Sequence, residues 1–104
     1  MGFISAANDG TAKLWTAAGE ELATFPCHEQ YIYGLAVLSS SEFATVSEDK
    51  SLKIFKDGQP AQTIPHPGVV WSVEALPNGD LVTGCQDGVV RVRADRIGHA
   101  RINM

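Results

Sequence analysis

The sequence is short of several features that mark common functional classes. Its 104 residues include two cysteines and eight basic residues against twelve acidic ones, with a formal net charge of −4. Non-specific nucleic-acid binders normally carry a basic face, so this balance argues against a nucleic-acid partner. No apolar run approaches the roughly 18 residues of a membrane-spanning helix, and the N-terminus lacks the positive region of a secretory signal. We therefore expect no membrane partner and a cytosolic or nuclear location.

The cysteines and histidines are too sparse for a disulfide framework or a metal centre. Small secreted domains usually need more than the two cysteines present, so we predict Cys27 and Cys85 to be small buried apolar side chains. A structural zinc ion needs four ligands at close spacing, whereas Cys27, His28, His66 and Cys85 are scattered along the chain. We predict neither a metal nor a cofactor.

A repeat organises what is present. Asp9, Asp49 and Asp87 recur at a nearly constant interval, and His28 and His66 are separated by the same interval as Asp49 and Asp87. Each aspartate ends a run of apolar, hydroxyl and small residues and precedes a second β-rich run. These paired runs are residues 3–9 with 11–15, 43–49 with 51–55, and 81–87 with 89–93. A period of about 40 residues with short β-rich runs is typical of WD40 β-propellers.

The local sequence supports strands joined by tight turns. Asp9-Gly10 and Asp87-Gly88 are strong hairpin signals because glycine accepts a positive φ, and Asp49-Lys50 is a weaker version. No stretch shows sustained helical periodicity, so we predict no helix in the repeats. Further turns are indicated at Ala18-Gly19, Asp57-Gly58 and Asn78-Gly79.

These patterns predict an all-β fold. We expect a partial WD40 β-propeller over residues 1–93, with about two and a half four-stranded antiparallel blades and blade boundaries near residues 16 and 56. The expected order has ten strands and ends on the run at 89–93, so that both terminal blades are incomplete. Residues 94–104 form a tail outside the repeat pattern.

Two units combine an aspartate, a histidine and a hydroxyl, which resembles a hydrolase triad. Because the same set occurs twice at one register, a brace within each blade explains it better than a single active site. We therefore predict no enzymatic activity. The predicted brace residues are Ser5, Asp9 and Trp15 in the first unit, His28, Thr45 and Asp49 in the second, and His66, Thr83 and Asp87 in the third.

The braces are degenerate. Phe55 and Arg93 stand where the repeat pattern has the tryptophan of Trp15, so the indole donor is missing from two units. Cys27 and Pro65 replace the glycine that usually precedes the histidine. We expect partial braces and none that is complete.

More particular runs extend the pattern beyond generic WD40 spacing. They are Phe3-Ile4-Ser5 with Asn8-Asp9, Tyr31-Ile32-Tyr33, the run 48–54, Ala61-Gln62-Thr63-Ile64, Trp71, Asn78-Gly79-Asp80, and Asp87-Gly88 with Arg91-Val92. With these runs the chain resembles the phospholipase A2-activating protein family of ubiquitin-binding WD40 proteins. The resemblance implies a seven-bladed propeller in the parent protein and ubiquitin or a ubiquitinated protein as partner. The family's helical domain, which docks on an AAA-type segregase, has no counterpart here.

Propellers usually bind partners on the face formed by the loops before each innermost strand and by the Asp turns, which we call the upper face. Tyrosine and tryptophan are typical anchors at such faces. The alternative for Tyr33 and Trp71 is packing between neighbouring blades, and the sequence leaves the two interpretations open. The predicted partner-binding residues are Asn8, Tyr31, Tyr33, Glu48, Val69, Trp71 and Gln86.

A propeller closes a ring of blades, and an open piece leaves apolar faces exposed. We therefore expect the remaining blades of a parent propeller, or other copies of the chain, as partners. The leading functional hypothesis is an interaction scaffold, a fragment of a ubiquitin-binding propeller in ubiquitin-dependent protein turnover. The alternatives are a generic WD40 adaptor for another protein or peptide, and a truncated product without autonomous function.

Overall fold

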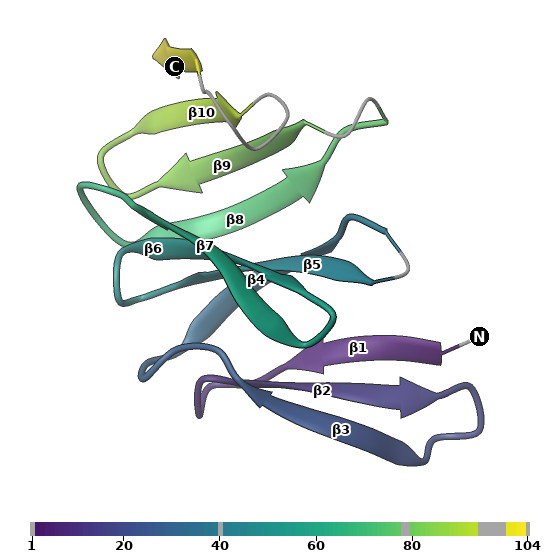
Figure 1. The fold of residues 1–104 in the computed structure, drawn as a ribbon. Coiled ribbons are helices and arrows are strands. Elements are labelled where there is room, and N and C mark those ends of the chain that lie inside the picture. The colour runs from purple at the N-terminus through teal and green to yellow at the C-terminus, as the bar shows by residue number, and fades with distance from the viewer. Residues whose placement is uncertain (1, 40, 78–79, 94–99, 104) are drawn as a thin grey trace.

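The computed structural model describes residues 2–39, 41–77, 80–93 and 100–103, which form eleven strands and no helix. The strands make three antiparallel sheets stacked face to face (Figure 1). The all-β prediction is confirmed. No helix in the described ranges is long and apolar enough to cross a membrane.

The first sheet has three strands in the order β1 (Gly2–Ala6), β2 (Thr11–Thr16) and β3 (Glu21–Pro26). The second runs β4 (Ile32–Val37), β5 (Glu42–Ser47), β6 (Ser51–Lys56) and β7 (Gln59–Pro65). Among the described residues, only β2 pairs with β1 within its sheet, whereas β5, the counterpart of β1, is flanked by both β4 and β6. The first sheet therefore lacks the innermost strand that the second possesses.

The third sheet corrects the predicted strand count. It comprises β8 (Val70–Ala75), β9 (Leu81–Cys85), β10 (Val89–Arg93) and β11 (Ala100–Asn103). The sequence pattern places the tail outside the repeat, but its β11 pairs antiparallel with β10, so the prediction that the last strand ends at Arg93 was wrong. Strand pairing is made by backbone groups, and a segment without the repeat's side-chain pattern can still supply them.

The boundaries between the sheets differ from the predicted blade boundaries. The predicted boundaries near residues 16 and 56 fall inside the hairpins β2–β3 and β6–β7, whose strands pair within one sheet. The breaks between sheets come after Pro26 and Pro65. A short turn keeps consecutive antiparallel strands adjacent, so the outermost strand stays with the blade that precedes it.

The Asp turns adopt the expected backbone. Gly10 and Gly88 have φ of 84° and 80°, and Lys50 takes the same left-handed conformation with φ 69°. Gly10 also has no room for a side chain, because an added Cβ would lie 1.9 Å from the carbonyl oxygen of His28. The predicted Asn78-Gly79 turn lies outside the described residues.

Two apolar clusters hold the sheets together. The larger lies between the second and third sheets, where Leu52, Ile54, Val70 and Leu81 are almost fully buried. Burying one such side chain stabilises the fold by about 1.5–3 kcal/mol. The smaller cluster lies between the first and second sheets and contains Ala12, Cys27, Phe43 and Phe55. Both cysteines are buried and free, as predicted.

Phe43 is the centre of an aromatic group in the smaller cluster. Its ring stacks on Phe55 at 5.1 Å between centroids and lies 5.8 Å from Phe25 of the first sheet. Phe55 occupies the position where the repeat pattern has tryptophan. In the second sheet, stacking of Phe55 on Phe43 therefore replaces the hydrogen bond that an indole would make.

Blade braces and a candidate protein-binding surface

The first sheet carries a single brace bond. The indole N–H of Trp15 on β2 donates to the hydroxyl of Ser5 on β1 at 2.9 Å. Asp9 serves the turn instead, because its carboxylate accepts from the backbone N–H and the hydroxyl of Thr11 at 3.0 and 2.7 Å. These bonds hold the pKa of Asp9 below its ordinary value.

The second sheet assembles aspartate, histidine and hydroxyl around the buried imidazole of His28. Its Nδ1 lies 2.7 Å from Asp49 Oδ2, and its Nε2 lies 2.8 Å from the hydroxyl oxygen of Thr45. A neutral ring satisfies both contacts when Nδ1–H donates to Asp49 and Thr45 donates to Nε2. His28 precedes β4, whereas Asp49 and Thr45 belong to the β5–β6 hairpin, so the brace fastens one connecting segment to that hairpin.

Burial and charge act in opposite directions on this pair. Desolvation lowers the pKa of His28, and the hydrogen bond and charge of Asp49 only partly offset it. Burial raises the pKa of Asp49, but hydrogen bonds from Ser51 and His28 outweigh that effect and leave it below its ordinary value. The favoured state is a neutral imidazole beside an ionised carboxylate.

Ser51 belongs to this brace and was missed at the level of sequence. Its hydroxyl donates to Asp49 Oδ1 at 2.6 Å, and its backbone N–H donates to the same oxygen at 3.0 Å. Thr11 stands two residues after Asp9 in the same relation. The recurring aspartate with a hydroxyl residue two positions later was the signal available in the sequence.

The third sheet uses a different partner for its aspartate. His66 Nε2 lies 3.2 Å from the hydroxyl oxygen of Thr83, as the pattern suggests. Asp87 pairs with the guanidinium of Arg91, at 2.8 Å between Oδ2 and Nη2 and 3.3 Å between Oδ1 and Nη1. Arg91 holds the pKa of Asp87 well below its usual range. Val89 follows Asp87 by two residues, at the position where Thr11 and Ser51 donate a hydroxyl to the aspartate in the other two sheets.

These distances show groups arranged to hold the strands together. In the second sheet, imidazole, carboxylate and hydroxyl bond to one another, and the bond between imidazole and hydroxyl recurs at the same register in the third sheet. In the part of the chain that the structure describes, no three His, Cys, Asp or Glu residues are grouped to hold a metal ion.

Three aromatic side chains form an exposed group on the upper face, which we call the aromatic surface: Tyr31, Tyr33 and Trp71. The Tyr33 ring lies 4.8 Å from that of Trp71 and 6.3 Å from that of Tyr31. Tyr31, Tyr33 and Trp71 remain 50%, 37% and 49% exposed. Tyr33 and Trp71 thus pack against each other between neighbouring sheets and also remain exposed to solvent, so the two interpretations from the sequence are compatible.

The Asp turns fix the position of this surface. Tyr33 donates its hydroxyl proton to Glu48 Oε1 at 2.8 Å, which raises the pKa of Tyr33. The backbone of Tyr31 accepts from the N–H of Glu48 and from the hydroxyl of Ser47. In the third sheet, the backbone N–H of Gln86 likewise donates to the Val69 carbonyl at 2.8 Å, and the Val69 N–H donates to Gln86 Oε1 at 3.3 Å.

Four of the seven predicted contact residues lie together at the aromatic surface. Tyr31, Tyr33 and Trp71 supply apolar area, and Glu48 anchors one of them with a carboxylate. Asn8 is exposed beside the first Asp turn, in a different sheet from the aromatic surface. Its register matches that of Glu48 and Gln86, each one residue before the turn aspartate.

Comparison with known proteins agrees with this geometry. The WD domain, G-beta repeat family matches residues 19–56 and 58–93. The chain belongs to the WD40 repeat family. It is 43% identical over 93 residues to the ubiquitin homeostasis protein lub1 of Schizosaccharomyces pombe, and 38% identical over 52 residues to a ribosome biogenesis protein WDR12 homolog of Trichoplax adhaerens. These matches cover 88% and 46% of the chain but only 13% and 12% of the relatives.

Solved WD40 structures show the same arrangement. The propeller domain of Doa1 matches with a TM-score of 0.89 at 29% identity, covering 99% of this chain and 36% of that one. The structure of U3-55K matches with a TM-score of 0.87 at 23% identity, covering 98% and 33%, and supports the fold alone. The expected partial WD40 propeller is confirmed, as is the resemblance to the family of ubiquitin-handling WD40 proteins.

Proposed function

We propose that this WD40 protein-interaction scaffold binds ubiquitin or a ubiquitinated protein through the aromatic surface. The observation that carries the proposal is the contact of Tyr33 with Trp71 at 4.8 Å, which joins two sheets while both rings stay exposed. Solvent-facing aromatic side chains bury a large area with little loss of entropy when a partner docks. The proposed role is binding and not catalysis.

The chemistry of the surface suits ubiquitin, which presents an apolar patch ringed by basic residues. Tyr31, Tyr33 and Trp71 offer the apolar and aromatic area, and Glu48 places a carboxylate beside it. The similarity to a protein named for ubiquitin homeostasis supports the choice of partner. We place this role in ubiquitin-dependent protein turnover, in the cytosol or nucleus.

A second part of the proposal concerns the neighbouring blades. Ile4 packs against the smaller cluster toward the second sheet, so alternation along β1 turns Phe3 to the other side of the first sheet, where its ring is 52% exposed and stacks on Trp15. We propose that the remaining blades of a parent propeller, or other copies of this chain, cover that side. Size-exclusion chromatography with light scattering checks this. A cooperatively folding monomer of these 104 residues at low concentration would contradict it.

Titration of isotope-labelled ubiquitin tests the proposed partner. The protein in its complete natural form should bind, and the Tyr31→Ala, Trp71→Ala double substitution should weaken binding at least about tenfold, because it removes two exposed anchors. A matched control is Leu76→Ala, which alters an exposed apolar side chain just after β8 and should bind as the parent does.

The outcomes separate the competing functions. Absence of ubiquitin binding by the unaltered protein refutes the ubiquitin role and favours a WD40 adaptor for another protein or peptide. Binding that survives the double substitution places the ubiquitin site elsewhere. Binding by the complete protein but not by the 104-residue chain agrees with a truncated product that lacks autonomous function.

A further inference from the structure

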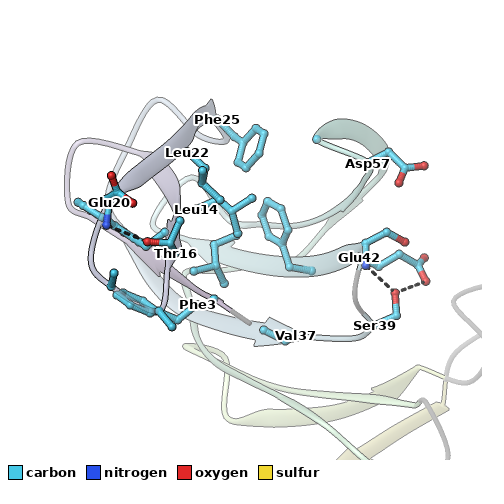
Figure 2. A pocket seen from close by; sticks show the side chains of 18 residues that line it. Phe3, Leu14, Thr16, Glu20, Leu22, Phe25, Val37, Ser39, Glu42 and Asp57 are labelled. Atoms are coloured by element: carbon cyan, nitrogen blue, oxygen red, sulfur yellow. Dashed lines mark hydrogen bonds between the residues drawn. The ribbon is translucent and has the colours of Figure 1, made fainter.

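A cleft opens between the first and second sheets, at the end of the strands opposite the upper face (Figure 2). Its volume is about 1130 Å³. The turn before Tyr31 leads into β4 on the upper face, whereas the cleft lies near Val37, where β4 ends. The cleft is therefore separate from the aromatic surface.

The walls of the cleft are mainly apolar. Phe25, Leu22 and Leu14 from the first sheet point toward the opening (Figure 2). Leu22 and Val37 are 61% and 60% exposed, which is unusual for aliphatic side chains that face a second sheet. An occupant with apolar side chains would remove this surface from water.

The described residues at the corresponding interface between the second and third sheets are more deeply buried. Ile54 holds the position there that Leu14 holds in the first sheet, and it is 1% exposed, whereas Leu14 is only half-buried. Ala75, the counterpart of Val37, packs against the core cluster. Among the described residues, equivalent side chains are thus more exposed at the cleft than at the other interface.

An aromatic group distinguishes this interface from the one between the second and third sheets. Phe43 lies between Phe55 and Phe25, with centroid distances of 5.1 and 5.8 Å, whereas Leu81 holds the equivalent position in the third sheet. The Phe25 ring also meets the β6–β7 turn, where an added Cβ on Gly58 would lie 2.8 Å from it. Two of these three rings, Phe25 and Phe43, line the cleft.

The rim of the cleft is acidic. Glu20, Glu42 and Asp57 line it, and none of the 18 lining residues is basic. Glu20 lies in the β2–β3 turn, residues 17–20, which is two residues longer than the equivalent turn at 57–58. Its backbone N–H bonds to the hydroxyl of Thr16 at 3.1 Å (Figure 2), so this turn is fixed at the rim.

We propose that the cleft is a second docking site, which takes an extended segment of a partner protein with an aliphatic or aromatic side chain next to lysine or arginine. The apolar side chain enters between Leu14 and Val37, and the basic side chain lies against the carboxylates of the rim. A strand added to the open edge of β1 covers the side near Ile4. It leaves Leu22 on β3 uncovered, because β2 lies between β3 and that edge.

Fluorescence anisotropy tests the proposal on the protein in its complete natural form. The probe is a short fluorescein-labelled peptide with a leucine–phenylalanine pair flanked by lysines. We expect saturable binding that weakens with added salt. Glu20→Lys should weaken it about fivefold, because it replaces attraction at the rim by repulsion. Leu22→Ser should weaken it about tenfold through lost apolar contact.

Matched controls keep the test decisive. Glu74→Lys reverses an exposed carboxylate on β8 of the third sheet and should leave binding unchanged. Peptides with glutamate in place of lysine, or serine in place of the apolar pair, should not bind. Lack of saturable binding overturns the proposal, as does equal binding by the parent, Glu20→Lys and Leu22→Ser. Ubiquitin binding should not change in either cleft variant, so the two sites fail or succeed independently.

Discussion

The Nδ1 atom of His28 lies 2.7 Å from the carboxylate of Asp49, across 21 residues of sequence. The imidazole side chain is completely buried, and its other nitrogen meets Thr45 at 2.8 Å. One ring thus fastens the segment before β4 to the β5–β6 hairpin, and this hairpin carries Glu48 at the edge of the aromatic surface.

Removal of this imidazole should destabilise the chain strongly. We expect His28→Ala to lower the free energy of unfolding by about 2–3 kcal/mol, because Asp49 and Thr45 lose a buried partner. Equilibrium unfolding in urea measures the loss. Asp9→Ala is the matched control, since Asp9 is exposed and bonds only within its turn, and it should have less than half the effect. Equal losses in the two variants would contradict a special role for the buried brace.

Acid should weaken the fold through the same ring. Burial lowers the pKa of His28 in the folded chain despite the nearby Asp49, whereas the unfolded ring titrates near its ordinary value of about 6.5. As the pH falls, the unfolded chain therefore binds the proton first. The contribution of neutral His28 to the free energy of unfolding is complete above about pH 6.5 and declines as the pH falls below that value.

Midpoints of urea unfolding, measured at about pH 7.5 and pH 5, test whether acid lowers the stability of the fold as expected. Asp49 also has a lowered pKa, but it adds its own acid sensitivity only below its ordinary value of 3.8. His28→Gln, which retains polar atoms without a titrating ring, should lose less stability between the two pH values than the parent does. A steeper loss in the variant would show that the folded state favours the imidazolium.

Restoration of the tryptophan of the repeat pattern should be unfavourable in the second sheet. Phe55 is 2% exposed and stacks on Phe43, so Phe55→Trp overfills the site and should cost about 1–3 kcal/mol of stability. Phe43→Leu copies Leu81 of the third sheet and makes room. The double variant should therefore be more stable than the sum of the single changes predicts, as measured in a double-mutant cycle. Strict additivity would argue against the steric explanation.

Lys50 holds a conformation that glycine holds in the other two Asp turns. Its φ of 69° is unfavourable for a side chain, and Gly10 and Gly88 adopt 84° and 80°. Lys50→Gly should raise the free energy of unfolding by about 0.5–1 kcal/mol, because relief of this conformation outweighs the entropy that glycine loses. Thermal denaturation reports the change. Gly10→Ala, where a Cβ meets the His28 carbonyl, should be destabilising in the same assay.

The repeat predicted many local features of the fold correctly. The turns at Asp9-Gly10 and Asp87-Gly88, the strands around them and the absence of helix in the described residues follow from the β-rich runs, the lack of helical periodicity and glycine chemistry, which act over a few residues. The eleventh strand was not predictable in this way, because its pairing with β10 depends on backbone groups and not on a side-chain pattern. Arg91 as the partner of Asp87 was also missed, since the repeat pattern directs attention to His66.

The sequence alone determined that this is a piece of a WD40 propeller. Its repeat places aspartates, histidines and hydroxyl residues at one register regardless of how the sheets pack. Only the tertiary structure decided how neighbouring sheets meet. Packing brings Tyr33 onto Trp71 from strands of different sheets and sets Phe43 between Phe25 and Phe55 beside the cleft. The packing of rings across an interface depends on contacts between residues far apart in the chain, and a local sequence pattern does not contain these contacts.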